Sequence, residues 1–218
     1  MFITRVKICC ISSIHEAQTA IKHGASALGL VGNMPSGPGI ITDDLIHEIA
    51  REVPPPISTF LLTSETKSEA VINHYRKVHT STIQIVDALD NREYHKIKAE
   101  LPGVKLVQVI HVIDESSVNE AIEIAEMVDA ILLDSGNPNL SVKELGGTGR
   151  THNWELSRKI RESIKVPIFL AGGLNQDNVR SAIETVEPYG VDLCSGVRTN
   201  GNLDEIKLEA FFKAIDSI

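Results

Sequence analysis

Short apolar segments alternate with segments of helical period along the 218-residue sequence, and this alternation restricts the folds that are open to the chain. Eight of the apolar segments are rich in Val, Ile and Leu and show no clean polar alternation, as is typical of parallel strands that are covered on both faces. The strands are predicted at residues 2–8, 27–32, 57–62, 82–86, 105–112, 129–133, 167–171 and 191–194.

Segments between these strands carry apolar residues at i, i+3, i+4 and i+7, which places them on one buried stripe of a helix. Residues with capping side chains predict helix starts near Thr42, Asp114 and Asn175. The three clearest stripes are Val118, Ala121, Ile122 and Ala125; Val179, Ala182, Ile183 and Val186; and Leu208, Phe211, Phe212 and Ile215.

Eight strand-then-helix units with short connections predict an α/β fold, the (β/α)8 or TIM barrel, as a single domain over residues 1–218. A doubly wound open sheet is the alternative. That fold usually has fewer strands and a glycine-rich loop after its first strand, whereas residues 9–13 contain no glycine.

The charge balance excludes some classes of partner. The formal net charge of −8 argues against nonspecific binding to nucleic acid or to a membrane surface, but it permits a small anion held by backbone dipoles. We find no secretory signal and no apolar run of the roughly 20 residues that a membrane span needs. The three cysteines and eight histidines show no ligand spacing, so we expect free thiols in the cytoplasm, no metal and no cofactor.

Glycine clusters follow the last three predicted strands. In a (β/α)8 barrel these loops lie at the carboxyl ends of the strands, where phosphate groups bind, and glycine lets backbone amides approach an anion closely. The alternative interpretation is that the glycines only form tight turns and bind no ligand. Three clusters on consecutive loops favour the phosphate site over this alternative. The predicted phosphate-binding residues are Gly147, Thr148, Gly149, Gly172, Gly173, Ser195 and Gly196.

Cys9 and Asp134 close the first and sixth predicted strands, on different sides of the barrel mouth. A thiol and a carboxyl facing each other across an anchored substrate suit proton abstraction at carbon combined with protonation of an oxygen. Lys7 shares the face of Cys9 and adds positive potential, whereas Cys10 has the opposite alternation and should point away. The alternatives are a small buried side chain for Cys9 and a turn cap for Asp134.

Several motifs in this order resemble the phosphoribosylanthranilate isomerase family. The matching segments are KIC at residues 7–9, LLDS at 132–135, GGTG at 146–149 followed by Trp154, LAGGL at 170–174 followed by NV at 178–179, and GVDLCSGV at 190–197.

The resemblance implies a TIM-barrel isomerase of tryptophan biosynthesis that works without a cofactor on a small phosphorylated sugar, as a monomer or a homodimer. Its reaction is the Amadori rearrangement of N-(5-phosphoribosyl)anthranilate. The resemblance assigns Asp134 as the acid that opens the ribose ring and Cys9 as the base at C2. Further candidate substrate contacts are Lys7, Gln84, Asp192, Arg150 and Arg198.

The sequence also departs from the family pattern. Residues 33–40 lack the arginine that the family places against the anthranilate carboxylate, and Val86 and Asp87 stand where the family has His-Gly. Arg150 and Arg198 are the candidates to supply the missing charge. Two alternatives stay open: a related barrel isomerase, epimerase or lyase for a different phosphorylated sugar, and a non-catalytic barrel that binds a phosphorylated ligand.

Overall fold

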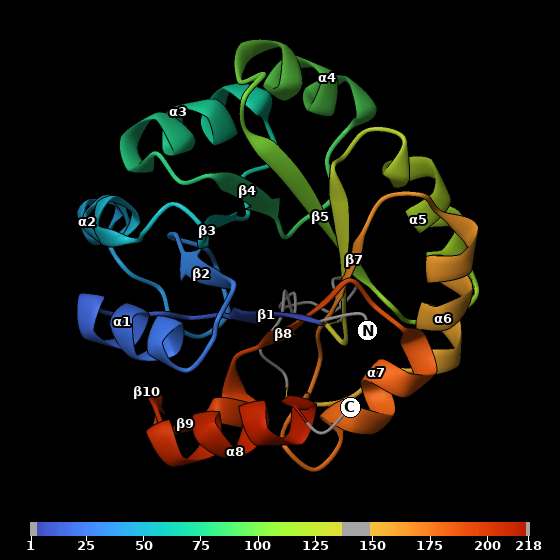
Figure 1. Ribbon diagram of the computed structural model, residues 1–218. Helices are drawn as coiled ribbons and strands as arrows, with labels where there is room; N and C mark the ends of the chain where they lie inside the picture. Colours follow the sequence, from blue (N-terminus) through green and yellow to red (C-terminus); the bar gives the residue numbers. More distant parts are fainter. Residues whose placement is uncertain (1–3, 137–148, 217–218) are drawn as a thin grey trace.

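The eight predicted strands form a closed parallel barrel in sequence order, with β1 hydrogen-bonded to both β2 and β8. A computed structural model describes residues 4–136 and 149–216 (Figure 1). The strands are β1 (Arg5–Ile8), β2 (Ala27–Val31), β3 (Ser58–Thr63), β4 (Thr82–Ile85), β5 (Lys105–His111), β6 (Ala130–Asp134), β7 (Ile168–Leu170) and β8 (Gly190–Leu193). The predicted (β/α)8 barrel is therefore confirmed.

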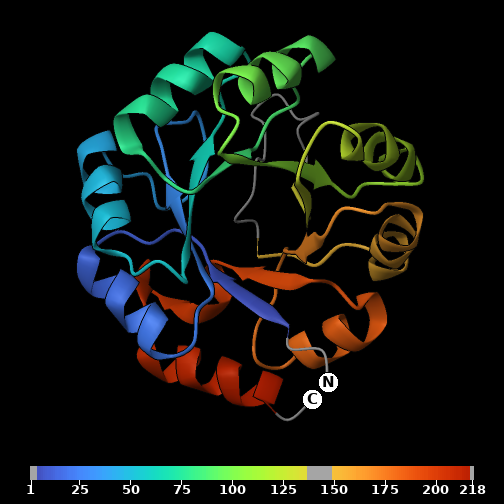
Figure 2. The ribbon, with the colours of Figure 1, turned by 45° about the horizontal axis from the view of Figure 1, so that its top comes forward.

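Helices surround the barrel as an outer ring, which Figure 2 shows from a second direction. They are α1 (Ile14–Lys22), α2 (Asp43–Glu52), α3 (Ser68–Val78), α4 (Asn91–Glu100), α5 (Ser116–Ala125), α6 (Trp154–Ser163), α7 (Val179–Val186) and α8 (Glu205–Asp216). A 3-10 turn, η1 (Ser195–Val197), and a hairpin of β9 (Arg198–Thr199) and β10 (Asn202–Leu203) separate β8 from α8. Within the described ranges, no helix is long and apolar enough to cross a bilayer.

Two of the three predicted helix starts are displaced. Thr42 caps α2 as predicted, since its hydroxyl accepts a hydrogen bond from the Leu45 amide at 3.3 Å. Asp114 instead closes a turn by accepting from the Ser116 amide at 2.8 Å, and α5 begins only after it. Asn175 forms a similar turn, and α7 begins at Val179. Asp and Asn form such side-chain turns as readily as helix caps.

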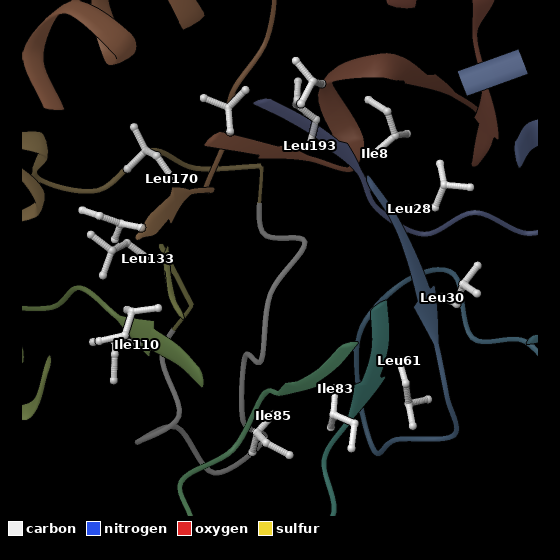
Figure 3. Packing of buried hydrophobic residues seen from close by; sticks show 14 of the residues in the cluster. Ile8, Leu28, Leu30, Leu61, Ile83, Ile85, Ile110, Leu133, Leu170 and Leu193 are labelled. Carbon is white, nitrogen blue, oxygen red and sulfur yellow. The ribbon is translucent and has the colours of Figure 1, made fainter. Parts of the chain in front are cut away.

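The strands do alternate, but both of their faces are apolar. Aliphatic side chains on the outer face pack between the strands and the helices, as Figure 3 shows. The inner face carries a second, smaller cluster that fills the barrel. The outer set includes Ile8, Leu28, Leu30, Leu61, Ile83, Ile85, Ile110, Leu133, Leu170 and Leu193, and the inner set includes Val31, Phe60, Leu62, Val86, Val107, Val109, Leu132 and Phe169.

The seam between β1 and β8 contains a buried ion pair inside the barrel. Lys7 and Asp192 are register partners, and the Lys7 ammonium lies 2.8 Å from the Asp192 carboxylate. Lys7 is 0% exposed and Asp192 is 8% exposed. Burial alone would lower the pKa of Lys7, but the adjacent carboxylate raises it above its ordinary value, so the lysine stays charged.

A second buried ion pair fixes the segment after β8 to α1. The Arg198 guanidinium donates to both carboxylate oxygens of Glu16, which also accepts from the amides of Ser12 and Leu203. The same guanidinium donates to the carbonyl of Cys10. Burial opposes ionisation of Glu16, but these donors outweigh it and lower its pKa.

We predict that Glu16→Ala lowers the free energy of unfolding by about 3–5 kcal/mol, because it leaves the Arg198 charge buried without a counter-charge. Urea unfolding at neutral pH measures the change. Glu162→Ala is the matched control: Glu162 pairs with Arg158 on the surface of α6, where such a pair contributes about 0.5 kcal/mol or less. Equal effects of the two substitutions would contradict this account.

Candidate active site

A pocket opens at the carboxyl ends of the barrel strands, and its described lining comes from most of the strands and from the loops that follow them. Both predicted catalytic residues contribute to it. The described lining residues are Cys9, Cys10, Val31, Met34, Ser36, Gly37, Pro38, Leu62, Gln84, Val86, Val109, Leu132, Asp134, Gly149, Ala171, Gly172, Gly173, Leu174, Asp192, Leu193, Cys194 and Ser195.

Asp134 ends β6 with its side chain inside the barrel, 7% exposed. Burial raises the pKa of Asp134 to about 6, and the nearby negative charge of Asp192 acts in the same direction. A hydrogen bond of 2.7 Å from the Ser135 amide to the carboxylate works against this rise. A carboxyl group with a pKa near neutrality suits a general acid.

Cys9 directly follows β1, on the same strand face as Lys7, and is 6% exposed. The buried Lys7 ammonium is close enough to Cys9 for their charges to interact. Gly29 on β2 makes room for both groups, because a Cβ there would lie 2.8 Å from the Cys9 sulfur and 3.1 Å from the Lys7 nitrogen. Sequence reasoning missed Gly29, since nothing within the segment ALGLV marks it as a neighbour of Cys9.

Asp192 and Gln84 occupy the pocket lining, as the sequence analysis predicts for substrate contacts. Lys7, also predicted as a substrate contact, is instead fully buried in its ion pair with Asp192 and lies outside the described lining. Gln84 is 3% exposed, and its side-chain oxygen has no hydrogen-bond partner in the described structure. Gln84 therefore keeps an unpaired side-chain oxygen at the pocket wall.

The glycine loops after β6, β7 and β8 pack against one another. A Cβ on Gly173, whose φ is +61°, would lie 2.6 Å from the carbonyl carbon of Arg150 in the first loop. A Cβ on Gly196 would lie 2.0 Å from the carbonyl oxygen of Leu174 in the second loop. Only glycine allows these approaches, so the three loops converge as the sequence predicts.

Free backbone donors accompany this convergence. In the part of the chain that the structure describes, the amides of Gly172, Gly173 and Gly196 donate to no other group. Amides gathered in this way are suited to an anion. Gly149 and Ser195 also line this side of the pocket, whereas the predicted contacts Gly147 and Thr148 lie outside the described residues.

Arg198 does not serve as the missing substrate cation, and that prediction is wrong. Its guanidinium is committed to Glu16 and to backbone carbonyls, and it is absent from the described pocket lining. Arg150 is exposed, and its backbone packs against Gly173 on the side of the pocket that the glycine loops form.

The orientation predicted for Cys10 is also wrong. Its φ of +62° turns the chain as it leaves β1, so strand alternation no longer applies, and Cys10 lines the pocket together with Cys9. Positive φ is uncommon for residues other than glycine, and the sequence gives no sign of it at this position.

The opposite wall of the pocket is apolar. It consists of inward-facing aliphatic side chains near the ends of β2 to β6, and Met34 from the loop after β2 lies beside them. No arginine or lysine is present in the described lining. The pocket therefore combines a side lined by glycine loops, a buried carboxyl and thiol, and an apolar side. The described residues of the apolar side are Val31, Leu62, Val86, Val109 and Leu132.

This arrangement matches a known family. The family model described as N-(5'phosphoribosyl)anthranilate (PRA) isomerase matches residues 6–214. The chain belongs to this family. The isomerase of Methanocella arvoryzae is 33% identical over 205 residues, covering 94% of each chain, and isomerase 2 of Methanosarcina mazei is 34% identical, covering 95% of this chain and 92% of its own.

Solved structures of PRA isomerases have the same fold. The Thermotoga maritima enzyme superposes with a TM-score of 0.84 at 28% identity, over 99% of this chain and 100% of its own. A second PRA isomerase structure, solved with reduced 1-(o-carboxyphenylamino)-1-deoxyribulose 5-phosphate, gives a TM-score of 0.82 at 26% identity with the same coverage. The predicted family, fold and enzyme class, an isomerase of tryptophan biosynthesis, are confirmed.

Asp134 should make the stability of this PRA isomerase depend on pH. Its pKa is about 6 in the folded protein and roughly 3.9 in an unfolded chain, so between these values the folded state binds the extra proton. The resulting stabilisation is complete below about pH 4 and is lost as the pH rises through 6, about 3 kcal/mol in all.

We predict that Asp134→Asn removes this loss, so that the variant is more stable than the wild type at pH 8. Urea unfolding of both proteins from pH 5 to pH 8 measures the difference. If the difference in unfolding free energy between wild type and variant is the same at pH 8 as at pH 5, a buried Asp134 that ionises in this range is contradicted.

Proposed function

We propose that Asp134 and Cys9 are the acid and the base of this PRA isomerase. The observation that carries the proposal is that one pocket joins both side chains to the convergent glycine loops. The apolar wall near the ends of β2 to β6 suits an aromatic ring, and the free amides opposite suit the phosphate of a sugar phosphate.

The reaction begins at the ring oxygen of the phosphoribosyl group. Protonated Asp134 donates its proton to this oxygen, and the C1–O bond breaks as the anilino nitrogen forms an iminium bond to C1. The Cys9 sulfur then takes the proton from C2. The electrons of the C2–H bond form the C1–C2 double bond of an enolamine, and proton transfer from the C2 hydroxyl to C1 gives the ketone.

Free thiols are consistent with work in a reducing compartment. Cys9, Cys10 and Cys194 are all unbridged in the structure. We accordingly assign the enzyme to the cytoplasm, as a single-domain protein whose substrate is a small phosphorylated sugar.

We predict that Cys9→Ala and Asp134→Asn each lower kcat/KM by about 100-fold or more, the usual scale for a lost acid or base. Steady-state assay with N-(5-phosphoribosyl)anthranilate measures both. Asp114→Asn is the control, because Asp114 follows the neighbouring strand but faces solvent. Wild-type protein that binds the substrate without turning it over would instead support a non-catalytic barrel.

We predict that Ser195→Asp raises the inhibition constant of inorganic phosphate by about tenfold or more, because a carboxylate in the loop repels the anion. Ser195 is exposed and lines the pocket, so the variant should fold. Ser181→Asp on the solvent face of α7 makes the same charge change away from the pocket and should leave the constant unaltered. Equal weakening by both variants would contradict a phosphate site at this loop.

The described lining offers no cation to the anthranilate carboxylate, so we predict weak selection for that group. An analogue with aniline in place of anthranilate should keep kcat/KM within about tenfold of the full substrate, whereas loss of a buried bidentate arginine contact commonly costs several kcal/mol. A 100-fold preference for the carboxylate would overturn this prediction. Its disappearance in Arg150→Ala would then assign the charge to Arg150.

A further inference from the structure

Two thiols that the isomerase reaction does not use meet in the pocket wall. The sulfur atoms of Cys10 and Cys194 lie 2.6 Å apart, and both residues line the pocket. Cys10 is buried and Cys194 is half-buried, with the pocket as their common route to solvent. The contact joins residues 184 positions apart in the sequence.

The β1–β8 seam brings these cysteines together. Ile8 and Leu193 are register partners, and the Cys9 amide donates to the Leu193 carbonyl at 2.7 Å, so Cys194 lies opposite Cys9 and diagonal to Cys10. With strands about 4.8 Å apart and a rise of about 3.3 Å per residue, a diagonal pair of Cα atoms lies about 5.8 Å apart, within the usual disulfide range. The positive φ of Cys10 turns its side chain toward Cys194.

A bond between the adjacent residues Cys9 and Cys10 is disfavoured by strain. Consecutive Cα atoms are about 3.8 Å apart, below the usual disulfide range of roughly 4.4–6.8 Å. Within the Cys10–Cys194 pair, the shared hydrogen bond lowers the pKa of Cys194 and raises the pKa of Cys10 well above its usual value. The positive charge of Arg198 contributes to the lowered pKa of Cys194, which makes Cys194 the nucleophile of the pair.

We propose that Cys10 and Cys194 form a reversible disulfide across the β1–β8 seam when the protein meets a hydroperoxide. The Cys194 thiolate attacks the terminal oxygen of the hydroperoxide, which breaks the O–O bond and leaves a sulfenic acid and an alcohol. The Cys10 sulfur then attacks the sulfenic sulfur and displaces water. Two thiols are thus oxidised by two electrons, and one hydroperoxide is reduced to an alcohol and water.

The consequence of the bond is mechanical. It would join the end of the first strand covalently to the end of the last, so that the barrel could not open at this seam. Restricting the unfolded chain in this way stabilises a folded protein more as the closed loop becomes longer. The proposal does not depend on the isomerase reaction, because its readouts are mass and unfolding temperature.

The test treats the intact protein with one equivalent of hydrogen peroxide, blocks remaining thiols with iodoacetamide, and maps tryptic peptides by mass spectrometry. The expected product links the peptide of residues 8–22 to that of residues 181–198, and dithiothreitol should release it. Cys9→Ser should retain the link, whereas Cys10→Ser and Cys194→Ser should each lose it. A link that persists in Cys10→Ser and disappears in Cys9→Ser would overturn the assignment.

Thermal unfolding supplies the second readout. The oxidised wild type should unfold about 5 °C or more above the reduced protein, and the Cys194→Ser variant should show no such shift. Peroxide treatment that yields sulfinic or sulfonic acids without the cross-link would overturn the proposal, as would a cross-link that leaves the unfolding temperature unchanged.

Discussion

The ion pair between Lys7 and Asp192 is the interaction on which the barrel and its pocket depend. It lies on the inner face of the seam where β1 meets β8, and its two residues are register partners there, so it favours the register in which the sheet closes. The same charges then act on the site: Asp192 helps to raise the pKa of Asp134, and Lys7 places positive charge near Cys9. An ion pair in a barrel interior would be costly as a stabilising device alone, and here it also sets the electrostatics of two reacting groups.

Different parts of the barrel line the two sides of the pocket. Residues near the carboxyl ends of β2 to β6 supply aliphatic side chains, and the loops after β6, β7 and β8 supply glycines and amides. Cys9 follows β1 and Asp134 ends β6, at the two borders between these regions. An apolar ring and a phosphate bound on their own sides would hold the sugar carbons between acid and base.

Periodicity alone predicted the barrel well, because its signal is repeated. The stripe that begins at Val118 and the apolar run that ends at Asp134 each fit one strand-and-helix unit, and eight such units leave few architectures. Cys9 and Asp134 could be predicted as site residues for the same reason, because the carboxyl ends of the strands define the mouth of the barrel. The barrel topology alone brings these two strand ends to one pocket, so no contact between distant residues had to be predicted.

Cys10, Arg198 and Gly29 were not predictable in this way. Strand alternation cannot anticipate the positive φ that turns Cys10 into the pocket. The sequence predicts a free cation at Arg198, because its partner Glu16 is 182 residues away along the chain. Gly29 acquires its meaning only from the Cys9 sulfur across the β1–β2 pair. Each case depends on a contact between segments that no local pattern connects.

The distance along the chain between Lys7 and Asp192 has a consequence during synthesis. The two residues are 185 positions apart, so at typical rates of translation Asp192 is synthesised roughly 10–40 s after Lys7. For that time the nascent sheet has an open edge at β1, which is the kind of surface that recruits strands from other chains. A charged lysine in the middle of that edge opposes such pairing. The residue that closes the barrel in the finished protein would therefore also disfavour edge pairing between growing chains.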